Sequence, residues 1–177
     1  MNEEIDDIIE RLARIVEAAQ PRKPTKQLYR LDWTPMVPYT EANIEAVKSS
    51  GVGSCVYEIW ERRNGTRTAV YVGETKALGA RLEQHMQESE ENEHLRSADF
   101  SKLFCSYAPL TGPIARKTVE RALWKLYSNA WNDEDGPKGM GVEGTVSIEE
   151  QFPEAYTINF NGTRKPMTGV TSPVTLP

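Results

Sequence analysis

The side chains best suited to chemistry lie between positions 57 and 120: two tyrosines, an arginine, a histidine and a glutamate. Tyr57 and Tyr71 carry phenols, which donate or accept a proton. Arg81 and His85 are four residues apart, so in a helix they share one face and offer a cationic fork for an anion and a group that titrates near neutral pH. Glu120 supplies a carboxylate, a hard oxygen ligand that suits Mg²⁺ or Mn²⁺. Together these types suit proton transfer beside a bound anion and a divalent cation.

The two tyrosines lie in a segment that predicts a β-hairpin, because the runs CVYEIWERR and TRTAVYVG flank Asn64-Gly65. A two-residue loop would place Tyr57 opposite Val72 and send Tyr71 to the other face of the sheet. A three-residue loop closed by glycine in the left-handed conformation would place Tyr57 opposite Tyr71 on one face. The glycine at the third loop position favours the second arrangement, but the sequence leaves the register open.

Two helices and a further strand are expected after the hairpin. ETKALGARLEQHM predicts a helix with Thr75 as N-cap and a buried row of Leu78, Leu82 and Met86. SADFSKLFCSYAPL alternates partly and predicts a third strand.

In the second helix, TGPIARKTVERALWKLYSNAWN, Thr111 and Pro113 mark the start. Its inward stripe consists of Ala115, Val119, Ala122, Leu123 and Leu126.

Glu120 lies one step off that stripe, at the edge of the core. Arg116, one turn earlier, is the neighbour with which such a glutamate ordinarily pairs.

The chain divides into three parts by composition. Residues 51–135 form the expected core domain, since the stretch from Gly51 to Ala108 contains no proline. Residues 1–50 predict an N-terminal helical extension: a helix over residues 3–19, a basic linker, and a short helix with Thr40 as N-cap. Residues 136–177 hold half of the glycines and nearly half of the prolines, so they predict a loop-rich C-terminal tail with at most a short strand pair at 156–160.

Composition excludes several classes of protein. With 38% hydrophobic and 27% charged residues, the chain is an ordinary globular protein, and no apolar run is long enough to cross a membrane. The acidic N-terminus does not resemble a secretory signal, and two cysteines are too few for a disulfide scaffold, so a cytoplasmic location is expected. The net charge is −5 and no segment is basic, although Arg62, Arg63 and Arg67 can form a local patch. The acidic stretch 88–93 is expected to be a solvated loop.

The order of the short motifs resembles that of the GIY-YIG nuclease superfamily. Val56-Tyr57 and Tyr71-Val72-Gly73 correspond to the two signature motifs, Arg81 follows Tyr71 by ten residues, and His85, a helical Glu120 and Asn132 come next in the family's order. The resemblance covers about half of the chain, roughly residues 53–132. It implies an α+β type of α/β domain with a small, mainly antiparallel, three-stranded sheet flanked by helices, and metal-dependent cleavage of phosphodiesters.

Residue by residue, the resemblance assigns catalysis to the two signature tyrosines, the arginine, the histidine and the glutamate: Tyr57, Tyr71, Arg81, His85 and Glu120. Glu120 would also hold Mg²⁺ or Mn²⁺, and Tyr57 would act as general base with His85 relaying its proton. Gly73, His94 and Asn132 are the candidate substrate-binding residues, with Asn129 a competitor for the last. Cys55 departs from the family, because it replaces the first motif's glycine.

The sequence therefore predicts a divalent-metal-dependent endonuclease that hydrolyses DNA. The alternative is a catalytically inactive copy of the same fold that binds a protein or nucleic-acid partner. Under either reading the N-terminal helix can mediate a homodimer or contact a protein partner. No membrane partner is expected.

Overall fold

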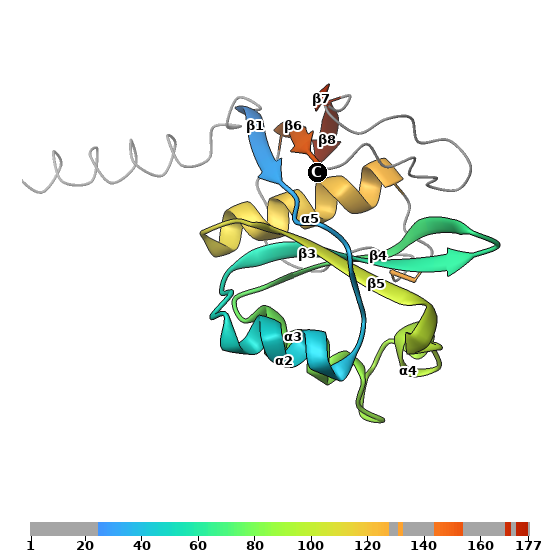
Figure 1. Ribbon diagram of the computed structural model, residues 1–177. Helices are drawn as coiled ribbons and strands as arrows, with labels where there is room; N and C mark the ends of the chain where they lie inside the picture. Colours follow the sequence, from blue (N-terminus) through green and yellow to red (C-terminus); the bar gives the residue numbers. More distant parts are fainter. Residues whose placement is uncertain (1–24, 128–130, 133–143, 154–168, 171–172, 177) are drawn as a thin grey trace, which may run out of the picture.

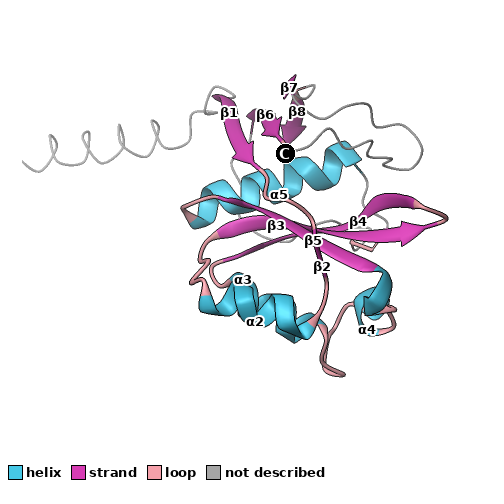
Figure 2. Ribbon diagram, in the orientation of Figure 1, coloured by secondary structure: helices cyan, strands magenta, loops and turns pink. Residues whose placement is uncertain are grey.

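The structure is a computed structural model that describes residues 25–127, 131–132, 144–153, 169–170 and 173–176. Its elements form layers (Figures 1 and 2). A central sheet has helices α2, α3 and α4 on one face and the long helix α5 on the other, and a second, smaller sheet packs on the far side of α5. The candidate residues lie on the central sheet and on the helices that cover its two faces.

The central sheet has the order β2-β5-β3-β4 and is antiparallel throughout. Its strands are β2 (Val37–Pro38), β3 (Cys55–Arg63), β4 (Thr66–Thr75) and β5 (Leu103–Pro109). β3 is central, and its residues 55–60 are buried on both faces because helices cover both sides. The predicted hairpin and third strand are confirmed, and β2 adds a short fourth strand.

The hairpin turn differs from the favoured prediction. Asn64 and Gly65 both have positive φ, 49° and 79°, and Arg63 pairs directly with Thr66, so the loop has two residues. A β-bulge at Val70 then shifts the register, which places Ile59 opposite Tyr71 and Tyr57 opposite Gly73. The three-residue loop is therefore wrong. The tyrosines nevertheless share a face, because the bulge rather than the loop supplies the extra residue.

Three helices cover one face of the central sheet: α2 (Glu41–Ser49), α3 (Leu78–His85) and the short α4 (Glu93–Arg96), followed by the 3₁₀ helix η1 (Phe100–Lys102). Thr40 caps α2 as predicted, since its side chain accepts a hydrogen bond from the backbone N–H of Asn43. The prediction for Thr75 is wrong: it is the last residue of β4, and its hydroxyl accepts from the N–H of Ala77, which precedes α3.

Helix α5 (Pro113–Tyr127) begins where the sequence predicts and separates the two sheets. The second sheet contains β1 (Thr25–Asp32), β6 (Gly144–Gln151), β7 (Gly169–Val170) and β8 (Val174–Leu176). β1 pairs with β6 in parallel, and β7 and β8 pair with β6 in antiparallel orientation. The mixed α+β class and the antiparallel sheet flanked by helices are therefore confirmed. The three-stranded sheet and the loop-rich tail are matched only in part, because β2 adds a fourth strand and described segments of the tail pair with one another and with β1 to form a second sheet.

Several predictions fall outside the described residues: the helix over residues 3–19, the strand pair at 156–160 and Asn129. Within the described residues, every helix is too short or too polar to span a bilayer.

Glu150 is a buried carboxyl in the layer between α5 and the second sheet, where it is 2% exposed. It accepts a hydrogen bond from the indole N–H of Trp33 at 3.2 Å and another from the hydroxyl of Tyr127. Burial raises the pKa of Glu150 from 4.5 to about 8, while the bond from Trp33 works in the opposite direction. Glu150 is therefore protonated in the folded protein at neutral pH.

We predict that Glu150→Gln removes a pH-dependent loss of stability. Between about pH 4.5 and pH 8 the folded state holds a proton on Glu150 that the unfolded state releases, so the free energy of unfolding falls as the pH rises. Relative to wild type, the variant should gain on the order of a few kcal/mol between pH 5.5 and 8.5 in urea titrations. Glu149→Gln, on the same strand but partly exposed, is the control and should show no such gain. A constant difference across pH would contradict the prediction.

Candidate active site

The position of Tyr57 depends on a close approach to Gly73 on the neighbouring strand. A Cβ at Gly73 would lie 2.5 Å from both Cζ and the hydroxyl oxygen of Tyr57, so only glycine leaves room for the ring. Tyr57 is fully buried, and its ring centroid lies 6.1 Å from that of Tyr71. The glycine of the YVG motif thus seats the first tyrosine beside the second. The sequence analysis assigned Gly73 to substrate binding. In the structure this residue packs against the Tyr57 ring.

Tyr57 begins a chain of buried hydrogen bonds. Its hydroxyl lies 2.8 Å from Nε2 of His85, and Nδ1 of His85 lies 2.7 Å from Oε2 of Glu90. His85 is fully buried and Glu90 is 3% exposed. A carboxylate can only accept, so Nδ1 donates to Glu90 and Nε2 is left as the acceptor for the Tyr57 hydroxyl. The arrangement is a proton path from phenol to imidazole to carboxylate.

The surroundings of Tyr57, His85 and Glu90 determine which of these three hydrogen-bonded groups is charged. Burial, followed by the nearby charge of Arg81, lowers the pKa of His85 to about 4, although Glu90 opposes the shift. Burial alone would raise the pKa of Glu90, but the N–H of Asn92, His85 and Arg81 together lower it. Burial raises the pKa of Tyr57 well above its usual value. At neutral pH the chain is thus a neutral phenol, a neutral imidazole and a carboxylate.

Arg81 connects the chain to the second tyrosine. Its charge acts on the phenols of both Tyr57 and Tyr71, and its Nη1 lies 3.7 Å from Oε2 of Glu90. It comes from the same face of α3 as His85, as the four-residue spacing predicts. Its side chain is 28% exposed, so solvent or a ligand can reach the guanidinium.

Glu120 reaches the site from the opposite face of the sheet, on α5. Its Oε1 accepts a hydrogen bond of 3.1 Å from the backbone N–H of Glu74, at the end of β4. Its charge acts on Tyr71, whose pKa it helps to raise after burial, and the charge of Arg81 acts back on Glu120. Glu120 therefore lies at the end of β4, where its charge and those of Tyr71 and Arg81 affect one another.

The expected partner of Glu120 is engaged elsewhere. Nε of Arg116 lies 2.7 Å from Oε2 of Glu74, so the ion pair links α5 to β4 through Glu74 instead. Among the described residues no cation lies within ion-pair distance of Glu120. Burial, then the neighbouring charge of Glu74, raises the pKa of Glu120 to about 7. A cation brought to this carboxylate would relieve both effects.

The residues present fit a single divalent cation. Within the described residues no group of three or more acidic, histidine or cysteine side chains forms a cluster that could enclose a metal. Mg²⁺ does not need one, because it is commonly held by one or two carboxylates, with waters and a substrate phosphate as the other ligands. Glu120 offers one oxygen beyond its bond to the Glu74 amide, and the Glu74 carboxylate is close by.

Asn132 lies at the edge of β4, where its side chain hydrogen-bonds to the strand's backbone. Its amide accepts from the N–H of Val72 at 2.9 Å and donates to the Val72 carbonyl at 2.8 Å, as a neighbouring strand would. The N–H of Trp131 bonds in turn to the carbonyl of Val70 at 2.8 Å. His94, on α4, is exposed and stacks on Trp131 with a centroid distance of 6.2 Å. Among the described residues, no hydrogen bond, ion pair or ring contact joins His94 or Asn132 to the five catalytic candidates.

Glu90 and Glu74 are the residues that sequence reasoning missed. The solvated-loop prediction for residues 88–93 is wrong at Glu90, because α4 folds the segment back and buries this carboxylate against His85. Asn92 caps α4 through Leu95 and also donates its backbone N–H to Glu90. That capping pattern is the one signal in the sequence that marks this loop as structured.

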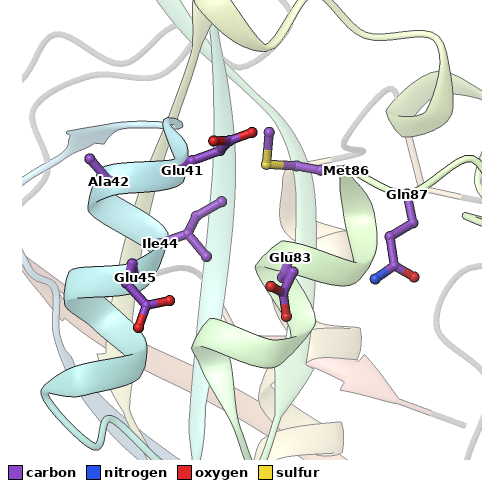
Figure 3. Close-up of a pocket in the computed structure, with 7 residues that line it drawn as sticks. All are labelled: Glu41, Ala42, Ile44, Glu45, Glu83, Met86 and Gln87. Atoms are coloured by element: carbon purple, nitrogen blue, oxygen red, sulfur yellow. The ribbon is translucent and has the colours of Figure 1, made fainter.

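The hollow between α2 and α3 is a separate feature (Figure 3). This groove of about 580 Å³ has Ile44 and Met86 among its lining residues, with Glu41 and Glu45 on the α2 side and Glu83 on the α3 side. Its carboxylates would repel a polyanion. The groove therefore does not extend the candidate site.

We predict that Gly73→Ala destabilises the fold, because the new methyl group overlaps the Tyr57 ring. Overpacking of this kind usually costs about 1 to 3 kcal/mol. The measurement is the urea midpoint of the full chain. Gly53→Ala is the matched control, since its Cβ would meet only one atom, at 3.8 Å. Equal stability of the two variants would show that the Tyr57 ring does not lie against Gly73.

Comparison with known proteins finds no matching family model, no similar curated protein and no similar solved structure.

Proposed function

We propose that this chain is a divalent-metal-dependent endonuclease that hydrolyses DNA phosphodiester bonds through a GIY-YIG-type site. The catalytic residues would be Tyr57, Tyr71, Arg81, His85 and Glu120. The observation that supports the proposal is their proximity: the Tyr57–His85 hydrogen bond, the ring contacts of Tyr71 with both, and the mutual charge effects of Tyr71, Arg81 and Glu120 link residues from β3, β4, α3 and α5. Their types supply proton transfer, phosphate binding and metal ligation in one place.

Arg81 is the group that would bind the scissile phosphate. It is the partly exposed cation of the cluster, and its planar fork matches two phosphate oxygens. Its charge acts on both tyrosine phenols. A phosphate bound by Arg81 would therefore lie beside the two tyrosines. The Tyr57 hydroxyl is buried, so substrate binding would have to give the attacking water access to it.

Tyr57 would then accept the proton of the attacking water while passing its own proton to Nε2 of His85. This transfer avoids a free phenolate, which the raised pKa of Tyr57 disfavours. Glu90 would stabilise the imidazolium that forms, through the bond to Nδ1. Tyr71, on the same face, would orient the water or the phosphate.

Glu120, with Glu74 close by, would hold Mg²⁺ or Mn²⁺. When bound, the cation supplies positive charge to the phosphate oxygens as negative charge builds up on them. The Glu74 amide fixes the Glu120 carboxylate, so its free oxygen has a defined direction.

The inactive interaction module has less support. A module that only binds a partner has no use for a buried proton path beside a partly exposed arginine. The convergence of the five side chains therefore favours the enzyme.

We predict that Tyr57→Phe and Glu120→Gln each lower metal-dependent cleavage of supercoiled plasmid by about a hundredfold or more, since each removes a group that acts on the reacting atoms. Branched and flapped oligonucleotides serve as further substrates. Tyr107→Phe is the matched control: Tyr107 lies directly opposite Tyr57 on β5, and it should retain full activity. Absence of cleavage by the folded wild-type chain on all these substrates would reject the nuclease and favour the interaction module.

We further predict that Glu90→Gln lowers kcat by roughly ten- to a hundredfold while KM stays unchanged. Glutamine can hydrogen-bond to Nδ1 but does not stabilise the imidazolium, and its N–H₂ can select the wrong tautomer. Loss of the Glu90 charge also lowers the pKa of His85 further, so the acid limb of the rate should move to lower pH.

Glu91→Gln is the control for this prediction, because it removes an exposed carboxylate next in the chain. Asp at position 90 should restore part of the rate. An equal loss of kcat and of thermal stability in Glu90→Gln, with an unchanged pH profile, would assign Glu90 a purely structural role.

A further inference from the structure

The hairpin of β3 and β4 extends past α4 and α5 and carries a pair of arginines (Figure 1). Arg62 and Arg67 are directly opposite each other in the strand register. Both guanidinium groups lie over the ring of Phe104 on β5, at 5.7 and 4.3 Å from its centroid. Nη1 of Arg67 also lies 3.9 Å from the sulfur of Met36. The pair is therefore held in place by an aromatic ring rather than by carboxylates.

Neither arginine of this pair forms an ion pair with a carboxylate in the described part of the chain. Arg63, next to Arg62 in the chain, forms an ion pair of 2.7 Å with Glu61. No carboxylate among the described residues lies within ion-pair distance of Arg62 or Arg67. Like charges directly opposite each other on a sheet cost stability. Two preoriented guanidinium groups without an internal anion suit an external one, and phosphate matches their planar forks.

The strand geometry relates this pair to the candidate active site. Arg67 and Tyr71 are four residues apart on β4 with the bulge at Val70 between them, so the span is at most about 13 Å. Successive phosphates of one DNA strand are about 3.4 Å apart along the axis, so this span corresponds to about four nucleotides.

The arginines and the active site can reach one ligand along the β4 edge. β4 is the edge strand of the central sheet. The arginines face the side of Phe104, which is opposite to the side of the tyrosines. The candidate active site includes Arg81 from α3, on one face of the central sheet, and Glu120 from α5, on the other face. Trp131 and Asn132 cover the edge of β4 between the two places, so a ligand that reaches both passes outside these two residues.

We propose that Arg62 and Arg67 bind the DNA backbone about four nucleotides from the bond that is cleaved, an inference that rests on the function proposed above. The pair binds phosphate and not bases, so it fixes the position of the duplex without reading its sequence. It supplies local positive charge on a chain whose net charge is −5.

The test is DNA binding by the full-length double variant Arg62→Gln/Arg67→Gln, measured by fluorescence anisotropy with a labelled duplex oligonucleotide in EDTA. We expect Kd to rise roughly tenfold or more at about 0.1 M salt, and the slope of log Kd against log salt to fall by about 2. In Mg²⁺, KM should rise while kcat stays unchanged. Arg62→Lys/Arg67→Lys keeps the charge and should restore most of the salt slope.

Arg30→Gln is the matched control, because it removes one exposed arginine of the second sheet, which is paired with Glu149. It should leave Kd and the salt slope unchanged. Unchanged DNA binding by the double variant, in a wild-type chain that binds and cleaves DNA, would overturn the proposal and leave the nuclease intact. Loss of binding to phosphatidylserine vesicles, with DNA binding unaffected, would overturn it as well.

The distance is tested by placing neutral methylphosphonate linkages along one strand of a duplex with a mapped cleavage site. Substitution about four nucleotides from that site should weaken binding by wild type but not by the double variant. Equal weakening of both proteins would show that this phosphate is bound elsewhere. Failure of wild type to bind or cleave any duplex rejects the nuclease itself, an outcome distinct from the other two.

Discussion

The contact of the Tyr57 ring with Gly73 is the constraint on which the rest of the candidate site depends. The ring occupies the space that a Cβ at Gly73 would take, and this seats its hydroxyl 2.8 Å from His85. The bulge at Val70 is equally necessary, because without it Tyr71 would lie on the other face of the sheet. Gly73 leaves room for the Tyr57 ring, and the extra residue Val70 brings Tyr71 onto the same face of the sheet. Helix α3 covers this face and contributes Arg81 and His85.

Burial gives this cluster its direction of proton transfer. In water, phenol and imidazole would titrate near their ordinary pKa values, and the proton would exchange freely with solvent. Here burial and Arg81 keep His85 neutral, while the amide of Asn92 keeps Glu90 ionised. Each hydrogen bond of the Tyr57–His85–Glu90 series then has one donor and one acceptor, so in the proposed reaction a proton released at Tyr57 would move inward toward the carboxylate. The positive charge that would then form on His85 lies 2.7 Å from Oε2 of Glu90.

The sequence predicts what local pattern controls and misses what long-range packing controls. The hairpin, the helix that starts at Pro113 and the Thr40 cap follow from turn residues, periodicity and capping, which act over a few positions. The second sheet requires β1 to pair with β6, which the chain order separates by the entire central sheet, and the alternation of β6 is obscured by Glu150 at an inward position. Glu90 is missed for the same reason, since nothing within the acidic stretch distinguishes the one carboxylate that tertiary packing buries from its exposed neighbours.

The two sheets meet at α5, and this explains how a site at the edge of one sheet can be rigid. One side of α5 packs on the central sheet and the other on the second sheet, through one continuous apolar cluster that includes Val56, Leu123 and Ile148. The ion pair of Arg116 with Glu74 and the bond from the Glu74 amide to Glu120 then fix the register between α5 and the end of β4. On the other side of the same strand, Trp131 and Asn132 close the edge by backbone-like hydrogen bonds. An edge strand is ordinarily the most mobile part of a sheet, but β4 is held from both sides, so residues contributed by opposite faces keep a fixed separation across it.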